Sequence, residues 1–333
     1  MELYKVATIH DVAKIAGVNS STVSRVINGK IKVLEETREK IYAAMKQLDY
    51  HPNSAARNLA NGRSNAIGIA VDVSNEDAFS NIFFNNSLFA IERIAQEKGY
   101  NLILTNVAMQ TGNSIEKLIL EQKVDGLIIP PSVIDPSLIN IIDEFPCVVL
   151  GQPKKNYNSL NWVDIDNVQG SKMAVKHLYK QGYSRIAYMC SKKYTSFSKH
   201  RVKGYKQALE NLQPLVYTTD GTLIHAKQQA ESVILSKEHP DAFICNDNIT
   251  AFGVLKALKE AGLNCPNDVG IVAFDNYPLS EFTEPQLTSI DIDTSILGQQ
   301  AAELLFKHIE YQNPNQHIIL ESTLIERESS KRQ

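Results

Sequence analysis

The stretch Thr8–Asn28, TIHDVAKIAGVNSSTVSRVIN, indicates two short helices joined by a tight turn. Thr8 can cap the first helix, and Asp11 places a carboxylate in its first turn. Gly17 ends that helix, where a residue with positive φ is commonly needed, and Asn19 or Ser20 can cap the second helix. The apolar residues of both helices recur at helical spacing, which predicts one inward face made of Ile9, Val12, Ala13, Ala16, Val23, Val26 and Ile27.

The outward face of the second helix carries short hydrogen-bonding side chains and one arginine. Such groups read base edges and bind DNA phosphates. A third helical pattern runs to about Leu48, and three short helices in about 45 residues are the size of a helix-turn-helix domain. A helical hairpin with a merely polar outer face is the alternative. We predict DNA contacts from Thr8, Ser20, Ser21, Thr22, Ser24, Arg25 and Asn28.

Charge is unevenly divided along the 333 residues, whose formal net charge is −3. Residues 1–63 contain ten Lys or Arg and six Asp or Glu, a net of +4, which leaves −7 for the rest of the chain. A basic head on an acidic body is typical of a DNA-binding module joined to a part that does not bind DNA. We therefore predict a helix-turn-helix head over residues 1–50 and a hinge over 51–65.

The hinge reads HPNSAARNLANGRSN from His51 to Asn65. His51-Pro52 breaks the third helix, and the following residues up to Ala60 contain helix formers with little apolar surface. Such a segment is either a plain linker or one that folds only on DNA, with a leucine wedged into the minor groove. The candidate DNA contacts in the hinge are Asn53, Ala56, Arg57 and Leu59.

The body, residues 66–333, alternates continuous apolar runs with amphipathic helical patterns, which predicts α/β parallel sheets covered by helices on both faces. The pattern begins again near residue 166. We therefore predict two doubly wound subdomains, one of about 66–164 plus crossover segments in 294–325, the other of about 166–290. The expected strands are 67–73, 101–107, 126–129, 147–150, 185–190, 242–245 and 270–274.

Polar residues follow several of these strands. Ligands of doubly wound sheets lie beyond the carboxyl ends of the strands, and a set of polar groups that converges there is better evidence of a site than any single loop cap. The pattern predicts a polar ligand cleft between the subdomains, near Asp72, Asn106, Asn246, Asp247, Asp275 and Asn276.

Other classes of protein find little support in the sequence. The patterns GxGxxG, GxxxxGK[ST], HExxH and GxSxG are absent, and the eight histidines do not cluster with metal-ligand partners, so we expect no enzyme, cofactor or metal. The four cysteines form no CxxC pair and are expected to be free thiols. Since neither a signal peptide nor a long apolar run occurs, we expect a cytoplasmic protein without membrane association. A sugar-binding module without a DNA role is the alternative class.

Several segments together resemble the LacI–GalR family of bacterial transcription regulators. They occur in the family's order over almost the whole chain: TIHDVAKIAGVNSSTVSRVIN, PNSAARNLANGRS, VDGLII, FICNDNITAFGVLKALKEAG, PNDVGIVAFDN and PQLTSIDID. The resemblance implies a homodimer, in some members a tetramer, whose two heads bind a palindromic double-stranded DNA operator. It also implies a body like a periplasmic sugar-binding protein, in which a small effector changes the cleft and the seating of the hinge helices.

The resemblance also implies effector contacts from Arg201, Asn246, Asp275 and the aromatic pair Phe83–Phe84. The sequence departs from the family pattern beside that pair, because Ile82 replaces the usual proline. The motif NSLNWVDIDNV is similar to maltose or maltodextrin repressors of low-GC Gram-positive bacteria. That likeness implies maltose or a maltodextrin as effector and a contact from Trp162, although a lone tryptophan is more often a core residue. A purine, a nucleoside or another sugar is the alternative effector.

Glu303 stands where catabolite control regulators tend to carry an arginine for a phosphorylated carrier protein. We therefore expect no phosphocarrier corepressor.

Overall fold

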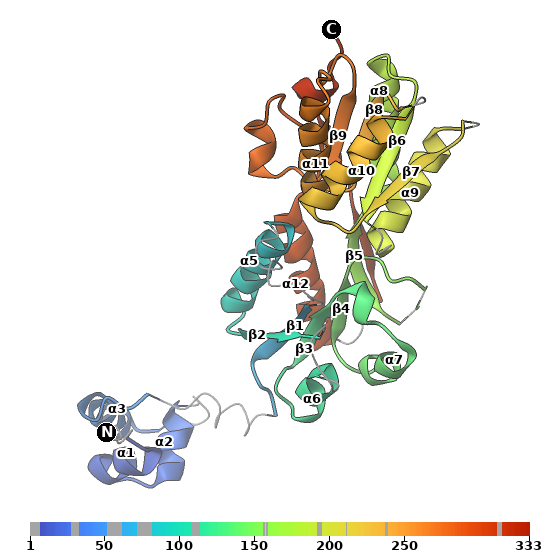
Figure 1. The fold of residues 1–333 in the computed structure, drawn as a ribbon. Helices are drawn as coiled ribbons and strands as arrows, with labels where there is room; N and C mark the ends of the chain where they lie inside the picture. Colours follow the sequence, from blue (N-terminus) through green and yellow to red (C-terminus); the bar gives the residue numbers. More distant parts are fainter. Residues whose placement is uncertain are drawn as a thin grey trace. The chain divides into compact units, whose positions relative to one another are not determined.

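The computed structural model describes residues 7–27, 33–51, 62–71, 82–107, 114–155, 157, 159–191, 195–210, 212–236, 239–311 and 315–333 (Figure 1). The chain divides into two compact units, Met1–Ser64 and Asn65–Gln333.

The first unit contains the helices α1 (Ile9–Ala16), α2 (Ser20–Ile27) and α3 (Glu35–Gln47). Thr8 caps α1 in a capping box with Asp11, whose carboxylate accepts the Thr8 amide hydrogen bond at 2.9 Å. Gly17 ends α1 with φ 67°. These features confirm the predicted helix boundaries. The core consists of the buried side chains of Val12, Ala13, Ala16, Val23, Val26, Ile41 and Ala44.

The first sheet of the second unit has six parallel strands in the order β11-β5-β4-β3-β1-β2. The strands are β1 (Ala66–Val71), β2 (Asn101–Asn106), β3 (Gly126–Ile129), β4 (Cys147–Leu150), β5 (Asn161–Ile165) and β11 (His317–Leu320). Helices cover both faces of this sheet. Two of them, α5 (Ile82–Glu97) and α12 (Thr294–Tyr311), pack against each other, and the others are α6 (Ser114–Leu120) and α7 (Pro136–Ile142).

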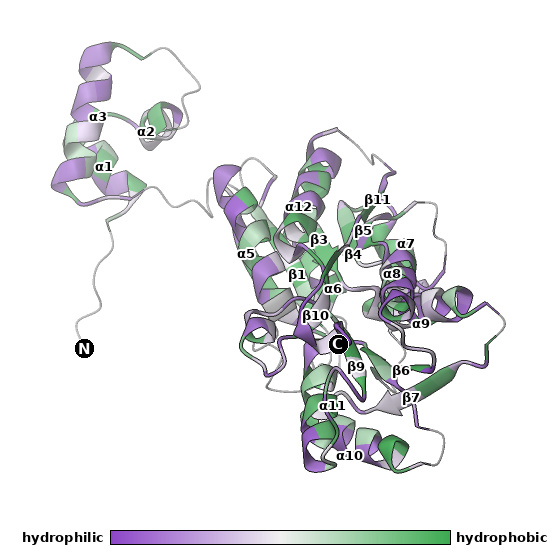
Figure 2. Ribbon diagram, turned by 90° about the horizontal axis from the view of Figure 1, so that it is seen from above, coloured by the Kyte–Doolittle hydropathy of each residue, from purple (hydrophilic) through white to green (hydrophobic). Residues whose placement is uncertain are grey.

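The second sheet has the order β12-β10-β9-β8-β6-β7, in which only β12 is antiparallel to its neighbour. The strands are β6 (Ile186–Ser191), β7 (Leu215–Thr219), β8 (Ala242–Cys245), β9 (Gly270–Phe274), β10 (Thr288–Asp291) and β12 (Thr323–Ile325). The helices are α8 (Asn167–Lys180), α9 (Ser196–Ala208), α10 (Leu223–Ile234) and α11 (Asn248–Glu260). Figure 2 shows hydrophobic strands enclosed by helices of mixed hydropathy.

The predicted fold class is confirmed: a helical head is followed by two subdomains that each contain a doubly wound sheet. Five strands were not expected, because their runs are short or interrupted by polar residues: β5, β7, β10, β11 and β12. The C-terminal crossover also differs from the prediction. Residues 323–325 pair with β10 in the second sheet, whereas we expected residues up to 325 to belong to the first subdomain.

The chain passes between the two sheets at three places, which are the connections β5–α8, β10–α12 and β11–β12. All three begin at the carboxyl ends of parallel strands, at residues 165–167, 291–294 and 320–323. The ligand position of a doubly wound sheet therefore coincides with the connections that join the subdomains.

Candidate effector cleft and DNA-binding head

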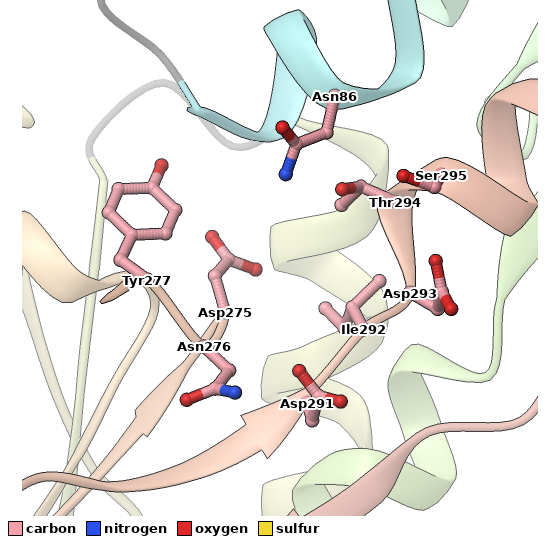
Figure 3. Close-up of a pocket in the computed structure, with 9 residues that line it drawn as sticks. All are labelled: Asn86, Asp275, Asn276, Tyr277, Asp291, Ile292, Asp293, Thr294 and Ser295. Carbon is pink, nitrogen blue, oxygen red and sulfur yellow. The ribbon is translucent and has the colours of Figure 1, made fainter. Parts of the chain in front are cut away.

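A cleft of ≈ 210 Å³ lies between elements of the two subdomains (Figure 3). Asn86 of α5 forms one side, and the residues that follow β9 form another. The remaining side is the crossover from β10 into α12. The lining residues are Asn86, Asp275, Asn276, Tyr277, Asp291, Ile292, Asp293, Thr294 and Ser295.

The lining is polar and rich in hydrogen-bond acceptors. Of the nine described residues that form it, three are aspartates, two are asparagines and none is Lys or Arg. Carboxylates accept hydrogen bonds and hydroxyl groups donate them. The cleft therefore suits an uncharged ligand with several hydroxyl or N–H groups, and its negative charge disfavours phosphates and carboxylates.

Asp275 follows β9 with φ 64°, a left-handed conformation that aspartate tolerates better than most residues. Its side chain is 13% exposed, and burial raises the pKa of this carboxyl to about 6, although the neighbouring Arg201 lowers it. The Arg201 guanidinium lies 3.5 Å from Asp275 Oδ1. The cleft thus contains a carboxylate whose ionised form is costly to hold in the free protein.

Arg201, on α9, is only 3% exposed and holds three chain segments together. Nη1 donates to the main-chain oxygen of Asn246 at 2.5 Å, and Nε donates to Asn167 Oδ1 at 2.8 Å. The guanidinium also lies over the Phe274 ring, 4.0 Å from its centre. Arg201 therefore supports Asp275 from behind and does not line the cleft.

A chain of hydrogen bonds continues from Arg201 to the first sheet. The amide nitrogen of Asn167 donates to Asp164 Oδ1 at 3.3 Å, and Asp164 Oδ2 accepts from the main-chain nitrogen of Gln152 at 2.8 Å. Burial raises the pKa of Asp164. Since Asp164 is in β5 and Asn167 begins α8, this network spans one of the connections between the subdomains.

Asn246 is also buried, at 2% exposed, directly after β8. Its Oδ1 accepts hydrogen bonds from the hydroxyls of Tyr188 and Ser198, each at 3.2 Å. With its main-chain oxygen bonded to Arg201, Asn246 belongs to the support of the cleft wall.

The structure separates the six predicted effector residues. Of the five whose side chains the structure describes, only Asp275 lines the cleft, and Arg201 and Asn246 lie behind it. Phe84 is partly buried against the core of the body, and the side chain of Phe83 lies outside the described residues, as does Asp72.

Trp162, which we also predicted to contact the effector, does not line this cleft. Trp162 is buried at 7% exposed among the residues that α6 and α7 cover, and it stacks on His317 with 4.7 Å between the ring centres. Alternation along β5 explains the difference: the flanking Val163 points into the other core cluster, and the Trp162 side chain takes the opposite face of the sheet.

The β10 side of the cleft was not predicted. Asp291, Asp293, Thr294 and Ser295 obey the same strand-end rule as Asp275. The signal was the polar sequence after TSID, but TSID is too short and too polar to be recognised as a buried strand.

The stability of the effector-free protein should depend on the titration of Asp275. In the folded protein Asp275 keeps its proton up to about pH 6, whereas the ordinary pKa of an aspartate is 3.8. Between these values the unfolded chain is the more ionised state, so the contribution of Asp275 to stability falls as pH rises and is constant above pH 6. Asp275→Asn should therefore gain about 2–3 kcal/mol over the wild type between pH 4 and pH 6.5. Urea unfolding of both proteins across that range measures the difference, and parallel pH profiles would contradict the assignment.

In the head, the outward face of α2 matches the prediction. Ser21 and Arg25 are exposed, Ser20, Thr22 and Ser24 are partly exposed, and Thr8 is exposed at the start of α1. Val23 and Val26 face the core. The predicted DNA contacts Asn28, Asn53, Ala56, Arg57 and Leu59 lie outside the described residues.

No helix among the described residues is long and apolar enough to cross a membrane. No group of three or more His, Cys, Asp or Glu side chains in the described part of the chain is arranged to hold a metal ion.

Comparison with known proteins assigns both parts of the chain. Residues 8–53 match the family described as bacterial regulatory proteins, lacI family, and residues 175–330 match the periplasmic binding protein-like domain. The transcriptional repressor PurR of Salmonella arizonae is 32% identical, over 97% of this chain and 96% of its own length. The transcriptional regulator CelR of Thermobifida fusca is 30% identical, over 99% and 100%.

Solved structures agree with this assignment. The lac repressor dimer bound to operator and an anti-inducer superposes with a TM-score of 0.87 at 27% identity, over 98% of this chain and 99% of that one. A probable maltose operon repressor from Staphylococcus superposes with a TM-score of 0.72, over 81% of this chain and 99% of that one, but its 24% identity shows a common fold alone. The helix-turn-helix head, the two-sheet body and relatives that match over nearly their full length lead to one conclusion: the chain belongs to the LacI family of DNA-binding transcriptional regulators.

Proposed function

We propose that this regulator represses a carbohydrate-utilisation operon and is controlled by an uncharged sugar bound in the cleft between its subdomains. The lining of the cleft carries the proposal, because three carboxylates and no cation among its described residues suit a neutral polyhydroxyl ligand. A carboxylate can accept two parallel hydrogen bonds from vicinal hydroxyls. Sugar phosphates and nucleotides are disfavoured by the same charge.

Among sugars we propose maltose or a maltodextrin, on the strength of the NSLNWVDIDNV motif. Other sugars are alternatives within this class, since the regulator CelR, whose solved structure is 28% identical to this chain, is a complex with cellobiose. A purine or nucleoside is the second candidate. The PurR relatives favour it, and the N–H edge of a base can also donate to Asp275 and its neighbours.

A thermal-shift panel tests the class of effector. The panel is maltose, maltotriose, cellobiose, ribose, hypoxanthine and adenosine, with maltose 1-phosphate as the charged control. A ligand that binds the folded state raises the melting temperature, and the shift grows with the logarithm of the ratio of ligand concentration to Kd. We expect a neutral sugar to raise it and the phosphate to have no effect. A shift with the purines alone would replace the sugar proposal with the second candidate.

For DNA we propose a homodimer whose two heads bind a palindromic operator through α2. A single helix-turn-helix buries too little surface for tight, specific binding, and two linked heads gain effective concentration. The lac repressor structure, which is a dimer on its operator, supports this arrangement. A regulator of this kind acts on chromosomal DNA in the cytoplasm. We propose no phosphocarrier partner, since an acidic side chain, Glu303, occupies the position in question, where Gln299 and Gln300 donate to its carboxylate.

Leu59→Ala should weaken specific operator binding by about 10–100-fold and leave nonspecific binding within about twofold. The reason is that an inserted apolar wedge stabilises a bent site, whereas nonspecific affinity arises from phosphate contacts. The operator is first selected from a random duplex pool with the full-length protein. Fluorescence anisotropy then compares the selected and a scrambled duplex at one salt concentration. Equal losses on both duplexes would remove the wedge from the proposal.

A further inference from the structure

Arg327 connects the C-terminal segment to the cleft. It lies between β12 and the 3-10 turn Glu328–Ser330, and its side chain is only 8% exposed. Nη2 donates to Asn276 Oδ1 at 2.9 Å, and Nη1 donates to the main-chain oxygen of Leu287 at 2.7 Å. The main-chain nitrogen of Arg327 donates to Thr288 Oγ1 at 2.9 Å. Arg327 is therefore held at both its main chain and its guanidinium.

This contact fixes the orientation of the Asn276 amide. A guanidinium only donates hydrogen bonds, so Asn276 has to present its oxygen to Arg327 and its NH₂ group to the opposite side. Figure 3 shows the amide nitrogen of Asn276 on the side of Asp291, and both residues line the cleft. Without the Arg327 guanidinium beside Oδ1, the amide could turn over, and either its oxygen or its NH₂ group could face Asp291.

We propose that Arg327 is a positioning residue for effector specificity, which acts by holding the Asn276 NH₂ group as a donor in a cleft otherwise rich in acceptors. The inference rests on the proposed effector function. It places an acceptor, Asp275, and a donor, Asn276, at consecutive positions, each held by a different arginine. The matching ligand is an uncharged molecule in which a donating hydroxyl neighbours an accepting oxygen, as the ring oxygen and hydroxyls of a sugar do.

The alternative is that Arg327 merely anchors the C-terminal segment. Glu281 provides a matched control, because its carboxylate accepts from the same Nη2 at 2.9 Å but is 60% exposed and does not line the cleft. Glu281→Gln removes the charge from that contact and leaves the Asn276 contact intact. If Arg327 only anchored the C-terminal segment, loss of either contact would have the same effect on effector affinity.

The test is a double-mutant cycle in the full-length protein, measured by calorimetric titration with the tightest-binding neutral compound of the thermal-shift panel. Asn276→Ala should weaken binding about tenfold, the usual effect of one lost hydrogen bond. Arg327→Lys should weaken it about fivefold, since one ammonium cannot replace the two directed contacts of the guanidinium. The double variant should bind no more weakly than Asn276→Ala alone, and Glu281→Gln should stay within about twofold of the wild type. Additive losses, or unchanged affinity in Arg327→Lys, would overturn the proposal.

A second measurement needs no ligand and so separates this proposal from the proposed function. The side-chain amide signals of Asn276 in a nitrogen–proton NMR spectrum are identified by their loss in Asn276→Asp. We expect them to shift in Arg327→Lys, or in Arg327→Gln if the lysine variant fails to fold, and to stay in place in Glu281→Gln. Signals that do not respond to either Arg327 variant show that Arg327 does not hold the amide, whatever the effector is.

Discussion

Asp275→Ala should reduce effector affinity by at least about 100-fold and make DNA binding insensitive to the effector. Two hydrogen bonds to an ionised carboxylate contribute about 1.5–3 kcal/mol each, so the loss of both has this size. The same variant should not destabilise the free protein above pH 6. Burial raises the pKa of this carboxyl to about 6, which means that its ionised form opposes folding.

Calorimetric titration of the effector and anisotropy with the selected operator measure the two effects. The matched control is Asp275→Asn, which keeps the shape and one acceptor and should retain part of the affinity. Near-normal DNA affinity of the effector-free variants shows that the heads are intact. A full effector response in Asp275→Ala would mean that the effector binds elsewhere.

Arg201→Ala should lower the free energy of unfolding by about 3–5 kcal/mol, the usual cost of removing one partner from a buried ion pair. The Arg201 guanidinium donates to Asn246 and Asn167 and lies beside Asp275, and all of these partners would lose a buried contact. Without the cation, the pKa of Asp275 should rise further, because Arg201 is the group that lowers it.

Urea unfolding at pH 7 measures this loss. The control is Arg93→Ala on α5, an exposed arginine with a 3.4 Å contact to Gln299, which should change stability by less than about 0.5 kcal/mol. An Arg201→Ala variant as stable as the wild type would show that the buried network contributes little.

The sequence allowed the fold class and one wall of the cleft to be predicted because both follow from local rules. Capping by Thr8 and the left-handed Gly17 define α1 without reference to anything distant. Asp275 was found because a long apolar strand ends directly before it. The order of strands within each sheet does not follow from such rules, since it depends on pairings between segments far apart in sequence.

The rest of the site depends on long-range contacts. Arg201 and Asn246 were recognised by resemblance, but their burial behind Asp275 is a property of how α9 packs on the sheet. Arg327 meets Asn276 across 51 residues, and no local pattern marks that contact. Trp162 lies away from the cleft for a related reason, because the face of β5 on which its side chain lies is determined by the helices that pack on the sheet.

The strands β11 and β12 follow each other in the chain but belong to different sheets, and this has a consequence for the synthesis of the protein. β11 completes the first sheet and β12 the second, so residues 317–325 supply an edge strand to both. A chain still emerging from the ribosome lacks one edge strand of each sheet until residues 317–325 have been synthesised. The head, whose contacts are local, can fold long before that. During synthesis, a folded DNA-binding head therefore precedes a completed body, and we expect the effector to act only once residues 317–325 have been added.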